Sequence, residues 1–202
     1  VDIATDTVAG IFNSADEIWV PNSAVAEVFR QYGGKKEARI YPNATDMLPV
    51  SDPEAAKRAV NEELSLIPEE KVFLFVGRLV IQKNIIFLAD AIAELKNRMN
   101  EPFKMIFVGS GADEEELRAH IEKLGIEDVC IFTGKITERE RLANLYCRAD
   151  LFVFPSLYDT NSLVQIEAAS QHTPSVFIEG AVTAESVKGG VNGYISEESP
   201  TS

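Results

Sequence analysis

Short apolar runs alternate with longer amphipathic segments along most of the chain. Continuous apolar runs are typical of strands covered on both faces, and apolar residues at three- and four-residue spacing are typical of helices. We expect strands at residues 17–20, 38–41, 72–76, 104–108, 129–133, 150–154, 174–178 and 193–195. Helices are expected at residues 84–99, 113–124, 137–147 and 161–171, with a capping box from Thr137 to Glu140. The alternation predicts an α/β fold with a doubly wound, Rossmann-like parallel sheet.

Three prolines, Pro42, Pro49 and Pro53, mark a loop near residue 45. Proline clusters of this kind separate periodic segments, so the loop is a candidate domain boundary. We therefore expect residues 1–45 and 46–202 to form two parts. The length of 202 residues fits one domain, or one domain with an extension.

The charge balance and the apolar runs exclude several classes of protein. Thirty-two acidic and 19 basic side chains give a net charge of -13, which argues against general binding to nucleic-acid backbones. No apolar run approaches the roughly 20 residues of a transmembrane helix. No basic segment followed by an apolar core is visible at the start, so no signal peptide and a cytoplasmic location are expected.

The cysteines and histidines carry no recognisable motif. Cys130 falls in an expected strand and Cys147 in an expected helix, at a separation that fits reduced core thiols rather than a metal or redox site. His120 lies among charged residues and is expected to be solvated, whereas His172 ends the last expected helix. Neither has a second His or Cys at ligand spacing, so no protein-built transition-metal site is expected.

Two carboxylates eight positions apart, Asp159 and Glu167, are the most informative pair in the sequence. Asp159 follows an apolar strand, and Glu167 lies in the next helix on nearly the same face as Leu163. A carboxylate on a buried face needs hydrogen-bond donors, and sugar hydroxyls are such donors. For Asp159 the alternative is an ordinary helix N-cap, and for Glu167 it is a buried salt bridge. The backbone N–H groups of residues 161–163 also open this helix and could hold a hydroxyl or phosphate oxygen.

Two cations, Arg78 and Lys83, follow the strand at residues 72–76, directly after Gly77. Ligands of doubly wound sheets bind beyond the carboxyl ends of the strands, which is where this loop is expected. An arginine fork, a lysine point charge and a helix N-terminus together suit a diphosphate. The alternative is a pair of solvated surface charges.

The glycines of the segment Gly109-Ser110-Gly111 resemble part of a dinucleotide-binding loop. The third glycine is absent and four acidic residues, 113–116, follow at once. These acids favour the helix dipole but repel a pyrophosphate, so no NAD site is expected here. We expect the glycines to serve a tight turn instead.

The order of these motifs resembles the C-terminal, donor-binding half of a GT-B glycosyltransferase of the retaining family-4 (group 1) type. The matching features are Gly-Arg…Lys after a strand, Gly-x-Gly before an acidic helix, Phe-x-Gly, Pro-Ser-x-x-acid-x7-Glu-Ala, and Asn-Gly before a short strand. The resemblance runs from about residue 39 to residue 198. Residues 15–30 resemble the last strand and helix of the N-terminal domain of such enzymes.

The resemblance implies a role for each matching residue. Arg78 and Lys83 would clamp the diphosphate of a nucleotide-sugar, Asp159 would contact sugar hydroxyls, and Glu167 would hold the ribose hydroxyls. The segment Gly134-Lys135-Ile136 would flank the nucleobase. In addition, Gly77 and residues Asn161, Ser162 and Leu163 would lie against the donor.

The resemblance also implies a reaction: retaining transfer of a hexose from a UDP- or GDP-type donor, with no metal and no further cofactor. The acceptor, a glycan, glycolipid or polymer, would be bound by an N-terminal domain that this chain lacks. We therefore expect an inactive fragment that still binds donor. The full-length protein could associate with a membrane surface.

Three departures from the family pattern bear on activity. Asp159 stands where Glu is usual, Thr160-Asn161-Ser162 stands where Gly-Phe-Gly is usual, and Gln171-His172-Thr173-Pro174 replaces a Gly-x-Pro turn. Losing two glycines restricts the backbone of the sugar-side loop. The alternatives to a transferase are a catalytically silent nucleotide-sugar-binding module and a dinucleotide-dependent enzyme, and the second lacks its glycine-rich loop.

Overall fold

The chain forms two compact units, one up to Ala44 and one from Thr45 onward. This computed structural model describes residues 3–200. The division lies one residue from the boundary expected from the prolines. Which parts of a larger protein the two units correspond to stays a prediction.

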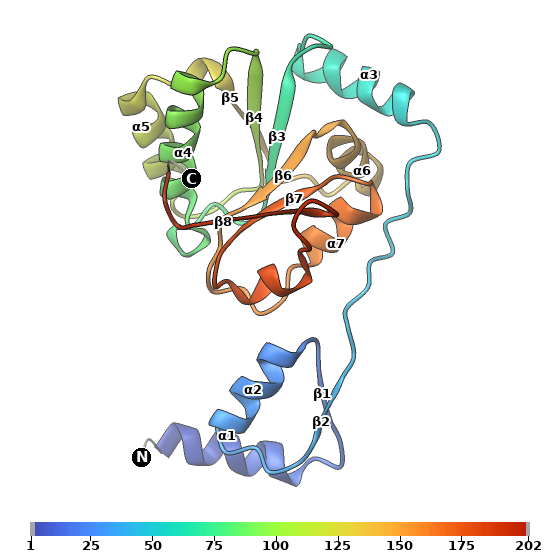
Figure 1. Ribbon diagram of the computed structural model, residues 1–202, viewed down its shortest axis with the longest axis vertical. Coiled ribbons are helices and arrows are strands. Elements are labelled where there is room, and N and C mark those ends of the chain that lie inside the picture. Colours follow the sequence, from blue (N-terminus) through green and yellow to red (C-terminus); the bar gives the residue numbers. More distant parts are fainter. Residues whose placement is uncertain (1–2, 201–202) are drawn as a thin grey trace. The chain divides into compact units, whose positions relative to one another are not determined.

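The first unit is a small helix–strand arrangement (Figure 1). Its two strands pair in parallel, and the helix between them is capped by Asn22, whose side chain accepts a hydrogen bond from the Val25 N–H at 2.9 Å. Trp19 stacks on Tyr41 with ring centroids 4.5 Å apart. The elements are α1 (Ile3–Ser14), β1 (Ile18–Val20), α2 (Ser23–Gln31) and β2 (Ala38–Ile40).

The second unit is a six-stranded, all-parallel sheet with helices on both faces (Figure 1). Its strands are β3 (Lys71–Val76), β4 (Phe103–Val108), β5 (Cys130–Gly134), β6 (Leu151–Phe154), β7 (Ser175–Ile178) and β8 (Gly193–Ser196). Its α-helices are α3 (Pro53–Leu64), α4 (Ile85–Arg98), α5 (Glu114–Leu124), α6 (Arg139–Arg148) and α7 (Leu163–Ser170). Short 3₁₀ turns are η1 (Ile81–Lys83), η2 (Glu127–Val129) and η3 (Val182–Ser186).

The strand order is β5-β4-β3-β6-β7-β8, which confirms the predicted doubly wound sheet. Within this sheet the chain begins at the central strand β3 and adds β4 and β5 on one side. It then returns to the centre and adds β6, β7 and β8 on the other side. The sheet order therefore reverses between β3 and β6, two strands that pair directly through Phe73 with Leu151 and Leu74 with Phe152. Crevices at such reversals are where ligands of this fold class bind.

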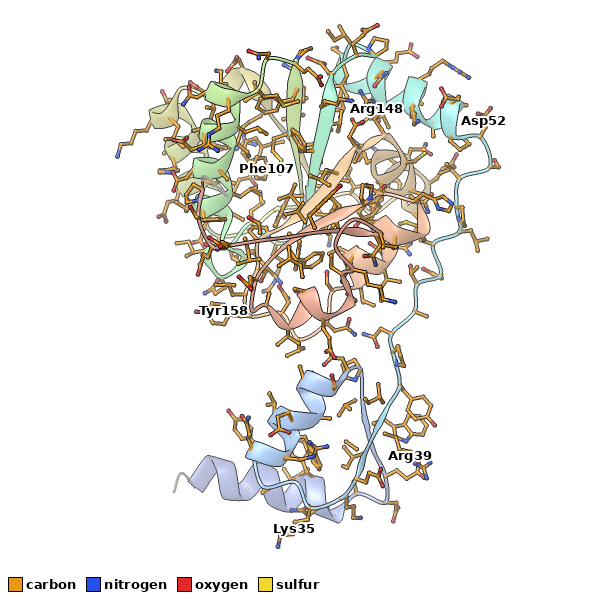
Figure 2. All side chains as sticks on the ribbon, in the orientation of Figure 1. Lys35, Arg39, Asp52, Phe107, Arg148 and Tyr158 are labelled. Carbon is orange, nitrogen blue, oxygen red and sulfur yellow. The ribbon has the colours of Figure 1, made fainter. Side chains whose placement is uncertain are left out.

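A row of phenylalanines crosses the sheet near its carboxyl edge. Phe107, Phe75, Phe154 and Phe177 come from β4, β3, β6 and β7, and neighbouring rings in this row have centroids 5.6–6.1 Å apart. All four are at most 2% exposed, and Figure 2 shows Phe107 inside the unit. Aromatic burial of this kind is a large part of core stability. The ring contacts pack the carboxyl ends of β3 and β6, from which the two loops leave the sheet, against the neighbouring strands.

The helices divide into two layers. α4 and α5 pack together on one face, while α6 packs against both α3 and α7 on the other (Figure 1). Among the described residues, no helix has both the length and the apolar character needed to cross a bilayer.

Each of the eight expected strands is present, with ends that differ by no more than one residue from prediction. Helix α3 was not predicted, although Asp52 caps it by accepting from the Ala55 N–H at 3.0 Å and Pro53 opens it. The predicted capping box is wrong. α6 begins at Arg139, beyond Thr137, whose N–H bonds to the neighbouring Glu138 carboxylate at 3.2 Å.

Candidate functional site

Lys83 and Asp159 form an ion pair at the reversal point of the sheet. Lys83 ends the loop after β3, and Asp159 lies in the loop after β6. Their side chains are only 16% and 21% exposed. The Lys83 ammonium also lies 5.5 Å from the centre of the Phe154 ring, an arrangement that stabilises a cation. A cation and an acid that lie 76 residues apart in the sequence thus meet at one place in the fold.

The second carboxylate oxygen of Asp159, Oδ2, is buried and accepts no hydrogen bond from the residues that the structure describes. A buried acceptor without a donor costs free energy, which a ligand hydroxyl would recover. Asp159 is not the N-cap considered for it, because Ser162 caps α7 instead. The Ser162 hydroxyl accepts from the Gln165 N–H at 3.2 Å.

Arg78 is exposed on the same loop as Lys83, and its side chain makes no ion pair or hydrogen bond within residues 3–200. The backbone of this loop is nevertheless fixed. Leu79 is fully buried, and its N–H donates to the Ser110 carbonyl at 3.1 Å. The Ile81 N–H donates to Asp113 Oδ2 at 2.8 Å. A guanidinium without a partner among the described residues therefore lies on a loop whose backbone is held by hydrogen bonds.

Gly109 and Gly111 allow the loop after β4 to lie directly against the loop after β3. A Cβ atom on Gly109 would lie 1.8 Å from the Gly77 carbonyl oxygen, and one on Gly111 would lie 2.1 Å from that of Leu79. The expected tight turn is thus also a close approach of two backbones. Gly77 takes part in the site through its backbone carbonyl, against which Gly109 packs.

The loops after β3 and β6 also touch through Asn84, which adopts a left-handed conformation with φ 58°. Its Nδ2 donates to the Pro155 carbonyl at 3.4 Å. Arg78 precedes η1 and Lys83 is its last residue, so Asn84 alone separates Lys83 from α4, which begins at Ile85. The helix that was expected to follow this loop thus begins one residue later than the predicted residue 84.

The start of α7 differs in part from expectation. Ser162 is 4% exposed, whereas Leu163 is 51% exposed. The prediction that Leu163 shares a buried face with Glu167 is wrong. Leu163 is the exposed first residue of the helix, whereas Glu167, one turn further along, is 12% exposed and contacts α6. Asn161 is half-buried in the loop, and Tyr158 of the same loop projects outward, 81% exposed (Figure 2).

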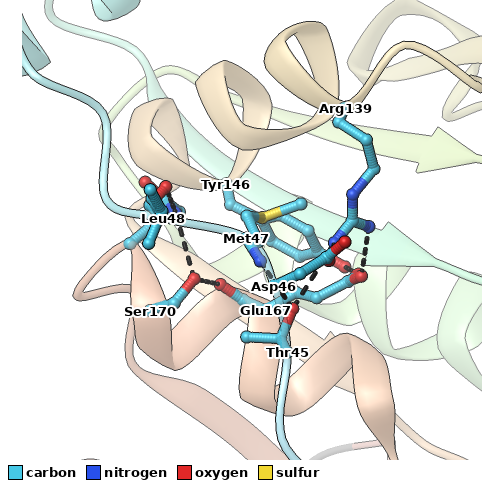
Figure 3. A network of polar contacts seen from close by, with 9 residues as sticks. Thr45, Asp46, Met47, Leu48, Arg139, Tyr146, Glu167 and Ser170 are labelled. Carbon is cyan, nitrogen blue, oxygen red and sulfur yellow. Dashed lines mark hydrogen bonds and ion pairs between the residues drawn. The ribbon is translucent and has the colours of Figure 1, made fainter.

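Glu167 has a donor on each carboxylate oxygen (Figure 3). Arg139 Nη1 donates to Oε1 at 2.6 Å, and the Tyr146 hydroxyl donates to Oε2 at 3.1 Å. The alternative of a salt bridge is thus realised, although Glu167 keeps some exposure. Both partners belong to α6, and neither was recognised in the sequence.

The segment expected beside the nucleobase follows β5. Lys135 is exposed, and Ile136 is 8% exposed, so the Ile136 side chain belongs to the core and only its backbone can face a ligand. Gly134 adopts φ 70°, which turns the chain from β5 toward α6. His120, expected to be solvated, instead pairs with Asp90 at 2.7 Å across α4 and α5.

The sequence matches a known protein family over most of the second unit. Residues 57–201 match the family model described as glycosyl transferases, group 1. Alpha-monoglucosyldiacylglycerol synthase from Streptococcus pneumoniae is 27% identical over 172 residues, which cover 84% of this chain and 38% of that protein. D-inositol 3-phosphate glycosyltransferase 2 from Catenulispora acidiphila is 37% identical over 147 residues, which cover 69% of this chain and 34% of that protein.

The fold has counterparts among solved structures. A crystal structure of Anabaena Alr3699/HepE in complex with UDP and glucose matches with a TM-score of 0.84 at 22% identity, covering 98% of this chain and 54% of that one. At that identity the likeness concerns the fold, which is the GT-B type. The chain spans little more than half of this structure and under two fifths of the two curated relatives.

Proposed function

The chain belongs to the group 1 glycosyl transferase family, and we propose that its second unit binds a nucleotide-diphospho-sugar donor. The observation that carries the proposal is the Lys83–Asp159 pair at the reversal of the sheet, with Asp159 Oδ2 buried and lacking a donor among the described residues. A cation for phosphate and an acceptor for a hydroxyl thereby lie side by side at the carboxyl ends of β3 and β6. A sugar diphosphate has both groups.

In this proposal Lys83 and Arg78 bind the diphosphate. An ammonium has three donors, and the bond to Asp159 leaves two for phosphate oxygens. Arg78 adds a planar guanidinium that pairs with no acid in the described part of the chain. The two cations come from one anchored loop, so little ordering is needed when the ligand binds.

Asp159 Oδ2, the oxygen that Lys83 does not contact, accepts a hydrogen bond from a hydroxyl of the donor sugar. Glu167 accepts hydrogen bonds from the ribose hydroxyls, and the backbone of Lys135 and Ile136 flanks the base. Asn161, Ser162 and Leu163 contribute backbone N–H groups near the sugar. The complex of Alr3699/HepE with UDP and glucose supports a donor of the UDP type, and a GDP-type donor is the alternative.

We further propose that the whole protein, rather than this chain alone, transfers a hexose with retention to a glycan, glycolipid or polymer acceptor. The bond from the anomeric carbon to the diphosphate breaks, and its electron pair stays on the phosphate oxygen. The acceptor oxygen bonds to that carbon, and its proton passes to the phosphate oxygen that leaves. Arg78 and Lys83 stabilise the charge that grows on the diphosphate.

A second function, donor binding without transfer, is favoured by the loop at Thr160-Asn161-Ser162. Within residues 3–200 the non-glycine residues with positive φ are Ser65, Asn84 and His172, so this loop lies in ordinary backbone conformations. The backbone N–H groups of this loop therefore lack the orientations toward the sugar that glycines with positive φ could adopt. If the full-length protein binds a donor tightly and neither hydrolyses nor transfers it, this second function is the correct one.

Isothermal titration calorimetry of this chain with UDP, GDP, uridine and guanosine tests donor binding. We expect one diphosphate to bind roughly tenfold or more tightly than its own nucleoside, because charge-assisted bonds to phosphate add to the affinity. Equal affinities for diphosphate and nucleoside in both pairs would contradict the proposal.

A further inference from the structure

Glu167 is held from two sides by residues of one helix, α6 (Figure 3). Arg139 is the first residue of the helix, and Tyr146 lies two turns further along. Their bonds to different carboxylate oxygens fix the plane of the carboxylate as well as its position. A single partner would leave the carboxylate free to rotate.

The Tyr146 hydroxyl is a permanent donor. Burial, together with the charge of Glu167, raises the pKa of Tyr146, so it keeps its proton throughout the ordinary pH range. The ring is fully buried and packs edge-on against Phe152 with centroids 5.8 Å apart. The Thr173 hydroxyl donates to the Tyr146 backbone carbonyl at 2.6 Å. Tyr146 therefore offers Glu167 a fixed donor.

Arg139 is held in turn by the segment that begins the second unit. It pairs with Asp46, and Arg139 Nη2 lies 3.4 Å from the Thr45 hydroxyl. The hydrogen bond to Glu167 raises the pKa of Arg139, which stays charged. Asp46 and Thr45, neither of which contacts Glu167, thus help to hold the guanidinium beside the Glu167 carboxylate.

The same segment is anchored independently at its other end. The Val50 N–H donates to Gln171 Oε1 at 3.0 Å, and Gln171 Nε2 donates to the Leu48 carbonyl at 2.9 Å. Met47, between these bonds and Asp46, is 5% exposed. The backbone that carries Asp46 is therefore held by the burial of Met47 and by the bonds of Leu48 and Val50 to Gln171, while the Asp46 side chain itself is exposed.

The bonds to Arg139 and Tyr146 leave Glu167 with acceptor capacity. A carboxylate has about four lone-pair sites, two on each oxygen. Each oxygen of Glu167 uses one, so one remains on each. Two neighbouring hydroxyls, as on a ribose, are the complementary pair of donors.

We infer that Arg139 and Tyr146 are positioning residues that orient Glu167 toward the two hydroxyls of a ribose. The inference rests on the proposed function, in which Glu167 binds the ribose of the donor. Neither residue needs to touch the nucleotide. Their effect is on how well the chain distinguishes a ribonucleotide from an analogue without these hydroxyls.

The test compares UDP with 2′,3′-dideoxy-UDP by calorimetry, or GDP with its dideoxy analogue if guanine is the preferred base. We expect Arg139→Gln and Tyr146→Phe each to lower the ribose-to-dideoxy affinity ratio by roughly three- to tenfold, because one of the bonds that orients a charged acceptor is lost. Affinity for the dideoxy analogue should stay within about twofold, since its other contacts are unchanged. A merely structural role would weaken both ligands alike.

Arg141→Gln is the matched control, because Arg141 lies on the same helix and pairs instead with Glu63 at 2.6 Å. It should leave the ratio unchanged. If Tyr146→Phe does not fold, Arg139→Gln and Arg139→Lys decide, and the lysine variant should fall between glutamine and wild type.

Glu167→Gln separates this inference from the proposed function. If Glu167→Gln abolishes the ratio but the Arg139 and Tyr146 variants keep it, the inference is wrong and the ribose assignment stands. If Glu167→Gln keeps the ratio, the ribose assignment itself is wrong. Tighter UDP binding by Arg139→Gln would mean that Arg139 occupies the site, which also overturns the inference.

Discussion

The ammonium of Lys83 and the carboxylate of Asp159 pair across β3 and β6, the two strands between which the order of the sheet reverses. Neither side chain is more than 21% exposed, and Phe154 lies beneath the cation. Burial of a charge is costly unless it is paired. The pair therefore links the stability of the second unit to the residues of the proposed donor site.

Removal of Lys83 should destabilise the chain. Lys83→Ala leaves the Asp159 carboxylate mostly buried and unpaired, and we expect a loss of about 1–3 kcal/mol in the free energy of unfolding. Urea denaturation measures this loss. The double variant Lys83→Ala/Asp159→Asn should recover part of it, because a neutral amide needs no cation. A single variant as stable as wild type would contradict the buried ion pair.

Arg78 should matter for binding but not for folding. Because its side chain is exposed and unpaired within the described residues, Arg78→Ala should change the free energy of unfolding by less than about 0.5 kcal/mol. Calorimetry should nevertheless show weaker binding of nucleoside diphosphate, with nucleoside binding unchanged.

Arg58 supplies the control cation for this experiment. It lies on α3 beside residues 68–71, at the amino end of β3, whereas Arg78 follows the carboxyl end. Arg58→Ala should leave diphosphate binding unchanged. Equal losses in the two variants would show that Arg78 acts only through net charge.

Gly109 should tolerate no side chain. Its Cβ would meet the Gly77 carbonyl oxygen at 1.8 Å, and its φ is +137°, so we expect Gly109→Ala to cost about 3 kcal/mol or more. Because the clash pushes on the loop that carries Arg78, UDP binding should weaken too. The matched variant Gly125→Ala has φ +67° but nothing within 4 Å, and should cost only about 1–2 kcal/mol. Similar losses in both would mean that the two loops are not in contact.

The parts of the fold that the sequence predicted correctly are those set by local pattern. Runs such as Phe103–Val108 are apolar because both faces of the sheet are covered, and every expected strand of this kind is present. α3 was missed because Asp52 and Pro53, a cap and a first helical residue, were interpreted as part of a loop.

The contacts of the site follow from tertiary structure and could not be predicted in the same way. Arg139 meets Glu167 from 28 residues away, and His120 meets Asp90 from 30. No spacing rule connects such positions, because their distance depends on how helices pack. Arg78, Lys83 and Asp159 could be nominated because their loops follow β3 and β6. Glu167 could be nominated because it lies in the helix after Asp159, but its partners Arg139 and Tyr146 could not.

His172 offers a way to stabilise the chain. It follows α7 at φ 63°, and the last turn closes through Thr173 N–H to the Ala168 carbonyl and His172 N–H to the Ala169 carbonyl, each 3.0 Å. This left-handed position after a helix favours glycine. We expect His172→Gly to raise the free energy of unfolding by about 0.5–1 kcal/mol, measured by urea denaturation. A loss of stability would mean that the imidazole makes a favourable contact.

The most direct measurement of the central claim is a crystal structure of this chain soaked with UDP-glucose, and with a GDP-sugar in parallel. We predict that a diphosphate contacts Arg78 and Lys83, that a sugar hydroxyl bonds to Asp159 Oδ2, and that the ribose hydroxyls bond to Glu167. A nucleotide bound away from the carboxyl ends of β3 and β6, or with its diphosphate out of reach of both cations, would contradict the assignment of these residues to the donor site.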